Sequence, residues 1–261
     1  MGRPLMKTIV YQSYRTHNVP DWISRCIQIV PRWAEKQGFE YRFFDDGFFD
    51  RVPAWFKQRV NHLVLPMSDL ARLLVGQDLL NEGFERVIWV DADVLIFDID
   101  QFRIDIPGTC AFCKEWWLGP NAKKKLQLYS RVNNAVSVFT RGSSVLDFYI
   151  ESAQAFVRHK CSQIGHADIG TQFLSRLHAL AHFPLLTNVG MISPWLLNDM
   201  AEGPGELTQR YMQHTNQPMF AANLCGSMVR GDVNAQNVER VVQQLLASHG
   251  AILNRYLVKT N

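Results

Sequence analysis

The sequence predicts an α/β fold in which a mostly parallel central sheet is flanked by helices. Two observations favour this class. Segments with strand and helix patterns alternate in a β-α-β order over residues 7–44, and residues 87–97 form an apolar run typical of a strand buried on both faces. With 261 residues, 47% of them hydrophobic, the chain can form one domain with a sizeable core. We therefore expect a single domain over residues 6–261.

Composition restricts the expected partners and compartment. The net charge of +3 is too small to indicate nucleic acid, no apolar run approaches the ~18 residues of a membrane span, and the N-terminus lacks the apolar core of a signal peptide. Five scattered cysteines, an odd number, favour reduced thiols. We expect a cytoplasmic protein without a nucleic-acid partner, with at most peripheral contact at the inner face of a membrane.

The first third of the chain gives the clearest elements. The segment Lys7–Tyr14 predicts a buried strand that turns polar at its carboxyl end, where ligand contacts are expected at Gln12 to Tyr14. The elements expected after it are a helix from Pro20-Asp21 that Pro31 kinks or splits and Gly38 ends, a strand at Tyr41–Phe44, a short helix after Pro53, and a helix from Pro66 to Leu80.

The remainder of the chain continues the alternation. A lysine run at Lys123–Lys125 is typical of a solvated helix face and also suits an anionic acceptor or a membrane surface. The expected elements are a strand at Thr109–Glu115, a basic helix containing Lys123–Lys125, a strand at Asn133–Phe139, a helix capped by Ser143 and Ser144 and running to about Lys160, a loop at Gly165–Gly170 feeding a helix at Thr171–Ala181, strands at Phe183–Gly190 and Met219–Cys225, and a helix from Asn234 to about Leu257.

Two acids interrupt the apolar run, at Asp91 and Asp93. An unpaired carboxylate inside such a strand would cost several kcal/mol, so a partner is required. The carboxyl end of a strand in an open parallel sheet is where ligands bind, and alternation by two puts both carboxylates on one side. Such oxygen ligands suit Mg²⁺ or Mn²⁺ with substrate phosphates completing the shell. The alternative is an exposed turn with both acids in water.

Other acids and another enzyme class compete with this interpretation. Asp98-Ile99-Asp100 lacks a following apolar run and predicts loop or helix-cap chemistry. Haloacid-dehalogenase-like phosphatases also place Asp-x-Asp after a strand, with the first Asp as nucleophile. That class expects Thr or Val where this chain has Leu95, and expects its motif near the N-terminus.

Three blocks of the sequence resemble the DXD-containing sugar-binding glycosyltransferases of the GT-A fold, a group that includes fungal initiating mannosyltransferases and, distantly, the clostridial glucosylating toxins. The first block is residues 9–16 with Pro20, Trp22 and residues 41–46. The second is Ser68-Asp69-Leu70-Ala71-Arg72, which matches an S-D-x-x-R helix start. The third is Asp91-Ala92-Asp93. The three blocks have the order and spacing that they have in this family, and the resemblance extends through about residue 140.

The resemblance implies a metal-dependent enzyme that moves a hexose from a nucleotide-diphosphate sugar to a glycan, lipid-linked or protein acceptor, with retention of configuration. Residues 6–140 would bind the nucleotide sugar and residues 141–261 the acceptor. Asp93 would bind Mn²⁺ or Mg²⁺, and Asp91 would reach the ribose or the metal. Tyr14 would stack on the base, and Asp69 with Arg72 would hold the donor sugar and phosphate.

Several assignments keep an alternative. Asp69 and Arg72 also suit a surface ion pair, and Asn133 and Asn134, candidates for sugar hydroxyls, also suit backbone capping. Asp168 is an acceptor-side base, a donor-sugar ligand or a helix N-cap. The family commonly carries a late histidine as a further metal ligand where this chain has Asn223, whose amide oxygen can also ligate a hard cation. The alternative to an enzyme is a non-catalytic module that binds a nucleotide sugar or a glycan, and Asn223 in place of the histidine favours it.

Overall fold

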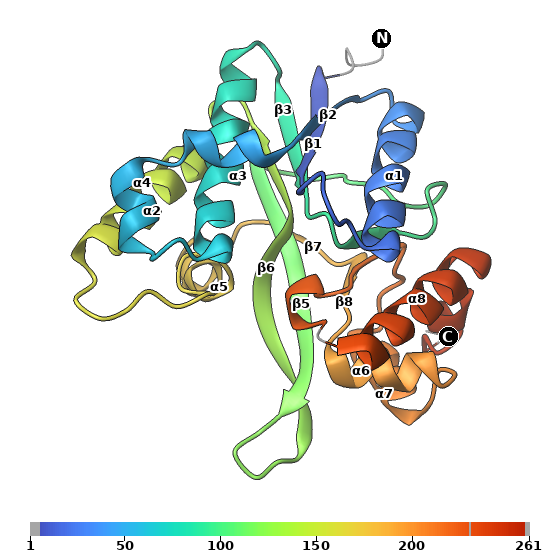
Figure 1. Ribbon diagram of the computed structural model, residues 1–261. Coiled ribbons are helices and arrows are strands. Elements are labelled where there is room, and N and C mark those ends of the chain that lie inside the picture. The colour runs from blue at the N-terminus through green and yellow to red at the C-terminus, as the bar shows by residue number, and fades with distance from the viewer. Residues whose placement is uncertain (1–5, 230, 259–261) are drawn as a thin grey trace.

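The computed structural model describes residues 6–229 and 231–258, and its centre is a six-stranded sheet in the order β2-β1-β3-β6-β5-β7 (Figure 1). All neighbouring strands pair in parallel except β6, which runs antiparallel to both β3 and β5. The prediction of a mostly parallel sheet is therefore confirmed. The strands span Thr8–Ser13 (β1), Glu40–Phe44 (β2), Arg86–Val90 (β3), Cys110–Pro120 (β5), Leu126–Thr140 (β6) and Leu185–Leu186 (β7).

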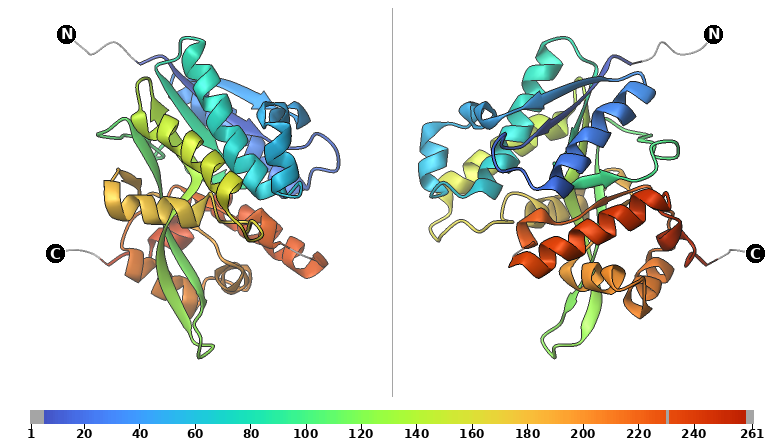
Figure 2. Two further views of the ribbon diagram at one scale, coloured as in Figure 1. Left: turned by 90° about the vertical axis from the view of Figure 1, so that its left-hand side faces the viewer. Right: turned by 45° about the vertical axis from the view of Figure 1, so that its right-hand side comes forward.

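Helices cover both faces of this sheet because its strands are apolar on both sides. On one face, α3 (Val64–Asn81) and α4 (Ser144–His159) lie side by side, as the left view of Figure 2 shows. On the other face lies α1 (Asp21–Lys36). Alternation along β1 divides the core accordingly: Ile9 and Tyr11 pack on the α3 side, and Val10 packs on the α1 side.

The apolar run at residues 87–97 is not one strand, which corrects the prediction. It forms β3 and then β4 (Val94–Ile96), which belongs to a separate three-stranded sheet ordered β4-β9-β8. A turn closed by a 3.0 Å hydrogen bond from Val94 N to Asp91 O carries the chain between the sheets. β4 pairs with β9 (Ala221–Asn223), and β9 pairs on its other side with β8 (Val189–Met191). Residues 87–90 and 94–97 are all buried, so their apolar character did not show that they belong to two different sheets.

The basic helix expected at Lys123–Lys125 is wrong, because these residues form the turn of a β5–β6 hairpin. Asn121 Oδ1 accepts from the backbone N–H groups of Lys123 and Lys125 at 2.9 and 3.1 Å, and Lys124 has φ 59°. The hairpin projects beyond the rest of the sheet (Figure 1), and its strands are longer than predicted.

The C-terminal helices pack together beside this hairpin (Figure 2, right). The helix expected from Asn234 to Leu257 is two helices, α8 (Gly231–Ala247) and α9 (Ala251–Asn254). Gly250 separates them with φ +76°, and a Cβ there would lie 2.3 Å from the Phe97 ring. Beside them lie α6 (Pro194–Ala201) and α7 (Glu206–Thr215).

The other elements follow the predictions closely. Helix α5 spans Thr171–Ala181 as expected, α2 spans Ala54–Arg59, and short 3-10 helices occupy Asp46–Arg51 (η1) and Gly226–Met228 (η2). Helix α1 passes through Pro31 without splitting. Ser143 precedes α4 but its side chain makes no capping hydrogen bond, which corrects that expectation. The single strand expected at Phe183–Gly190 is wrong, because the segment forms two short strands, β7 and β8, in different sheets. The strand expected at Met219–Cys225 is β9, which is shorter than predicted.

No helix in the described part of the chain is both long and apolar enough to cross a bilayer. The three last residues of the predicted domain, 259–261, lie outside the described residues.

Candidate active site

The turn at Asp91-Ala92-Asp93 lies in a cleft of ≈ 1830 Å³. Residues from β1, α3, both sheets, the start of α5 and the C-terminal helices line this cleft. Typical small-molecule sites measure roughly 300–1,000 Å³, so the space suffices for two substrates side by side. The alternative of a fully solvated turn is not what the structure has, because Ala92 is buried and the Asp91 side chain is 23% exposed.

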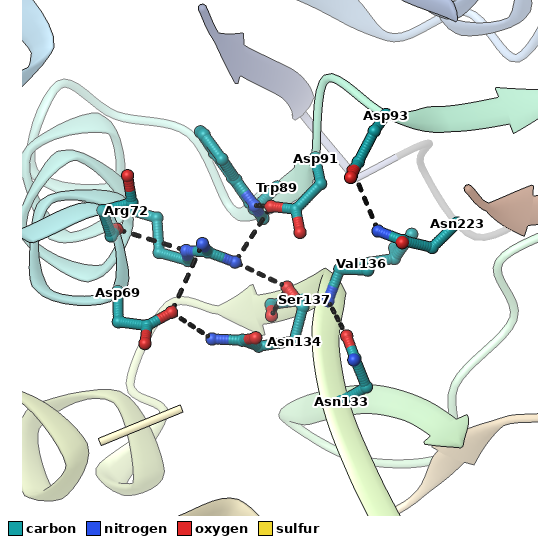
Figure 3. A network of polar contacts seen from close by, with 12 residues as sticks. Asp69, Arg72, Trp89, Asp91, Asp93, Asn133, Asn134, Val136, Ser137 and Asn223 are labelled. Atoms are coloured by element: carbon teal, nitrogen blue, oxygen red, sulfur yellow. Dashed lines mark hydrogen bonds and ion pairs between the residues drawn. The ribbon is translucent and has the colours of Figure 1, made fainter. Parts of the chain in front are cut away.

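Arg72 connects helix α3 to this turn (Figure 3). Its Nη1 lies 3.0 Å from Asp91 Oδ1 and donates to Asn134 O at 2.9 Å, and its Nη2 lies 3.3 Å from Asp69 Oδ1. Its Nε donates to Ser68 O at 3.2 Å. The side chain is 6% exposed, so the predicted alternative of a surface ion pair is wrong. These four contacts occupy most of the five guanidinium N–H groups, so Arg72 mainly positions protein groups.

Asp91 is held at one oxygen and open at the other. Trp89 Nε1 donates to Asp91 Oδ1 at 2.5 Å, in addition to the contact with Arg72. Asp91 Oδ2 accepts no hydrogen bond from any described residue. Burial raises the pKa of Asp91 well above its usual value; Arg72 lowers it, and the neighbouring Asp93 raises it. The negative charge of Asp93 therefore opposes ionisation of Asp91.

Asp93 is held by donors from β9 and from the start of η2. Asn223 Nδ2, from β9, donates to Asp93 Oδ1 at 2.9 Å, and Gly226 N donates to Asp93 Oδ2 at 2.6 Å. The amide of Asn223 is oriented by Cys225 N, which donates to Asn223 Oδ1 at 2.7 Å. The backbone thus uses one lone pair of the amide oxygen. This differs from the expected metal-ligating role of Asn223, because the group that it turns towards Asp93 is a donor.

An irregularity in β6 brings Asn134 to Asp69 and Arg72. Ser137 pairs with Phe112 and Asn133 pairs with Cys113, so residues 134–136 stand opposite no residue of β5. Bulges of this kind redirect side chains at functional sites. Asn134 Nδ2 donates to Asp69 Oδ1 at 2.8 Å. Burial raises the pKa of Asp69, while Arg72 and Asn134 lower it.

Asp69 also lies against the start of α5. A Cβ on Gly170 would be 2.7 Å from Asp69 Oδ2, so this close approach requires glycine. The S-D-x-x-R segment of α3, Asn134 of β6 and the Asp-x-Asp turn therefore meet at one place.

Asn133 has a different partner from Asn134. Its Nδ2 donates to Glu115 Oε2 at 2.7 Å, and its Oδ1 accepts from Ala135 N at 2.7 Å. The hydrogen bond from Ala135 N is the local backbone bonding expected as the alternative for these amides, whereas the bond to Glu115 is a contact between strands. Glu115 was not singled out by the sequence. Its only signal is a single acid within the apolar strand pattern of residues 109–117.

The polar end of β1 and the residues just after it border the cleft: Ser13, Tyr14 and Arg15 line it, whereas Gln12 does not. Tyr14 lines the cleft with a half-buried ring, and the Arg15 guanidinium carbon lies 5.5 Å from the centre of that ring. Gln12 is fully buried: its Nε2 approaches Asp91 O at 3.4 Å, and its Oε1 accepts from Tyr41 at 3.0 Å. The expected donor contact of Gln12 is therefore corrected, because this side chain lies behind the turn.

Asp168 is not among the residues that line the cleft. Its Oδ2 forms an ion pair with Lys160 and accepts from Gly165 N at 2.6 Å. Burial raises the pKa of Asp168, but the Lys160 ammonium and the Gly165 N–H outweigh it, so the pKa lies below its usual value. A carboxylate held in this way is a poor base. Gly170 occupies the N-cap position of α5, so the N-cap alternative is also corrected.

The pair Asp91 and Asp93 fits a divalent cation. Asp69 and Asp91 share one guanidinium, that of Arg72, and the nearby Asp93 has no ion pair with a basic side chain in the described part of the chain, so the acids of the cleft outnumber the one basic group paired with them. No three His, Cys, Asp or Glu side chains among the described residues form a closed metal-ligand set. A cation here would rely on two carboxylates, water and a phosphate ligand, which is the usual Mg²⁺ arrangement.

Comparisons with known proteins agree with the fold. No protein-family model and no curated protein sequence matches the chain. The chain is similar to the crystal structure of a glycosyltransferase involved in the glycosylation of the major capsid of PBCV-1, with a TM-score of 0.50 and 10% identity, over 91% of this chain and 99% of that chain. A197 from STIV matches 56% of this chain and 68% of its own, with a TM-score of 0.27 and 12% identity, too weakly to support an argument. The first likeness shows a shared fold.

Proposed function

We propose that this protein is a glycosyltransferase that moves a hexose from a nucleotide-diphosphate sugar to an acceptor, with Mn²⁺ or Mg²⁺ bound by Asp91 and Asp93. One observation carries the proposal: two carboxylates, those of Asp91 and Asp93, line a large cleft at the end of a strand of a mostly parallel sheet. Repelling charges are costly to hold together unless a ligand uses them. The fold shared with a capsid glycosyltransferase supports the same class.

The charge on the cleft floor also explains why a cation is needed. A diphosphate carries negative charge and would be repelled by Asp91 and Asp93 alone. A bound divalent cation would neutralise the diphosphate as the bond from the sugar C1 to the diphosphate oxygen breaks. Asp91 Oδ2 is open for it, and each Asp93 oxygen accepts one hydrogen bond from another described residue and so keeps a lone pair for a cation.

The remaining residues of the site orient the reacting groups. Arg72 holds Asp69 and Asp91 in fixed positions, and Asn223 with Gly226 holds Asp93. Asp69, beside the start of α5, is the acid that we place against the hydroxyls of the donor sugar. Tyr14 is placed under the nucleotide base. The resemblance to the DXD-containing glycosyltransferases implies that the acceptor attacks the face that the diphosphate leaves, with retention of configuration, and we include this in the proposal.

A thermal-shift experiment with a donor panel tests the proposal. UDP-, GDP-, ADP- and dTDP-hexoses are each added with Mn²⁺, with Mg²⁺ or with EDTA. We expect one donor to raise the Tm with a divalent cation and to lose that effect in EDTA, since a ligand at 100 times its Kd stabilises the folded state by ~2.7 kcal/mol. No shift with any donor would contradict the proposal.

Release of nucleoside diphosphate separates an enzyme from a binding module. The donor that stabilises the protein is incubated with it, and free nucleoside diphosphate is measured. Release supports the enzyme, whereas binding without release favours the module. Release of inorganic phosphate from phosphate esters, without a donor effect, would favour the phosphatase class.

A further inference from the structure

The cleft extends from the Asp91-Ala92-Asp93 turn along one face of the β5–β6 hairpin. Glu115 and Trp117 are two apart on β5 and therefore share a face, and both line the cleft. Arg131, directly opposite Glu115 on β6, lines it as well. We call Glu115, Trp117 and Arg131 the hairpin face. None of them contacts Arg72, Asp91 or Asp93 through a hydrogen bond or ion pair.

Glu115 is a buried carboxyl with one oxygen left for a ligand. Its side chain is 4% exposed; Oε2 accepts from Asn133, and Oε1 lies 3.7 Å from Arg131 Nη1, beyond hydrogen-bond distance. Burial raises the pKa of Glu115, while Asn133 and Arg131 lower it. A buried oxygen without a close donor, in the wall of a cleft, is suited to accept a hydrogen bond from a hydroxyl.

Trp117 supplies a flat, half-buried ring beside this carboxyl. A Cβ on Gly119 would lie 3.0 Å from Trp117 Nε1 and 4.0 Å from the Tyr129 ring, so the glycine allows the indole to lie along the strand. Tyr129, opposite Trp117, is itself fixed by donating to Pro120 O at 3.0 Å. The ring is thus supported by the hairpin on one side and borders the cleft on the other.

We propose that the hairpin face binds the carbohydrate part of the acceptor, so that the acceptor is a glycan with an uncharged sugar at its reactive end. A sugar ring has an apolar face of C–H groups that packs on an indole, and a rim of hydroxyls that bonds to Glu115 and Arg131. This inference rests on the proposed function and names the substrate class that it leaves open.

The charges of the hairpin face favour a neutral sugar over other occupants. Glu115 and Arg131 nearly balance each other, which gives no attraction for a strongly anionic group. A nucleotide phosphate would be repelled by the buried Glu115. A lipid chain would need a continuous apolar surface, whereas here one ring is flanked by two charged groups.

Binding and transfer measurements test this inference with the full chain. The probes are p-nitrophenyl glycosides of common neutral hexoses and N-acetylhexosamines. Binding is followed by saturation-transfer NMR in the presence of nucleoside diphosphate and Mn²⁺, and transfer is followed with the donor found above. The variants are Trp117→Ala, Trp117→Phe and Glu115→Gln, with thermal unfolding measured for each.

We expect Trp117→Ala to raise the acceptor KM at least tenfold while the donor KM changes less than twofold. Trp117→Phe should retain most of the affinity, which a purely structural loss would not do, and Glu115→Gln should raise the acceptor KM as well. Lys114→Ala is the matched control, because Lys114 bonds to Ser130 on the opposite face of the same hairpin. It should change neither constant.

Three outcomes would overturn the inference: the parent protein binds none of the glycosides, Trp117→Ala binds them as the parent does, or Trp117→Ala raises the donor KM equally. The last outcome would move the hairpin face to the donor. If the parent protein bound no donor, the proposed function would be refuted instead. The NMR measurement of glycoside binding would still test the hairpin face in that case, because it needs no donor sugar.

Discussion

Arg72 Nη1 lies 3.0 Å from Asp91 Oδ1, and this ion pair joins helix α3 to the turn that carries both acids. The two residues are far apart in the sequence, and each comes from a different block of the resemblance described above. The Arg72 guanidinium also lies 5.0 Å from the Trp89 ring, whose indole donates to the same Asp91 oxygen. Helix, strand and turn are therefore joined by side-chain contacts at the cleft.

Arg72→Ala should strongly destabilise the protein. Removal of one partner of a buried ion pair leaves uncompensated charge and costs ~3–5 kcal/mol, here at both Asp69 and Asp91. Arg72→Lys keeps the charge but lacks the planar fork, so the contacts to Ser68 O and Asn134 O cannot all form. We expect urea unfolding to give an intermediate loss for lysine. If Arg72→Ala lowered the unfolding free energy by less than ~1 kcal/mol, the ion pairs of Arg72 would behave as exposed pairs do, which would contradict their burial in the structure.

Tyr14→Ala should weaken nucleotide binding by ~1–3 kcal/mol, the range for an aromatic side chain stacked on a base. Tyr14→Phe is the matched control, because it keeps the ring and removes only the hydroxyl, and it should bind nearly as the parent does. Calorimetric titration with nucleoside diphosphate and Mn²⁺ measures both. Equal affinity of the alanine variant and the parent would leave Tyr14 with a packing role alone.

Asn223→Asp distinguishes a positioning residue from a metal ligand. In the structure the Asn223 amide donates to Asp93, so a carboxylate in its place removes a donor and adds a like charge. We expect the metal-free variant to lose ~1–3 kcal/mol of unfolding free energy and to regain much of it with Mn²⁺. Thermal unfolding with and without Mn²⁺ measures this. An unchanged metal-free stability would favour a ligand role for Asn223 and contradict its hydrogen bonds.

Asp168→Asn should change stability in a pH-dependent way. Because the folded-state pKa of Asp168 lies below its unfolded value, the ionised group stabilises the folded protein above the unfolded pKa of ~3.9. That contribution is lost as pH falls through the folded pKa. We expect Asp168→Asn to cost ~1 kcal/mol at pH 7 and progressively less below pH ~4, with little effect on nucleoside diphosphate release. A large loss of turnover at full stability would restore Asp168 as a catalytic residue.

The sequence predicted those structural features that depend on local pattern. The start of β1, the bounds of α5 and the position of Asp91 and Asp93 in a cleft each follow from short-range periodicity or from a strand ending in acids. The function of the two acids stays a prediction. The loop role of Asp98 is confirmed as well, since its Oδ1 accepts from Asp100 N and Gln101 N, both at 3.0 Å.

Features set by distant contacts were not predictable in this way. The apolar pattern of β4 is the same whichever sheet it joins, and the lysine turn depends on two long strands pairing around it. Gln12 lies behind the turn because Tyr41 and Asp91 enclose it. Glu115 has no spaced partner in the sequence, and its importance arises only when β6 brings Asn133 and Arg131 beside it.

The central claim, that Asp93 helps to bind a cation needed for glycosyl transfer, is tested most directly by nucleoside diphosphate release in Mn²⁺. The variants are Asp93→Asn and, as a matched control, Asp100→Asn, an exposed acid of the second Asp-x-Asp that pairs with Lys36. Circular dichroism verifies that each variant is folded. We predict that Asp100→Asn keeps the parental rate, whereas Asp93→Asn loses ~100-fold or more, as the parent does in EDTA. Parental release by folded Asp93→Asn would contradict the account.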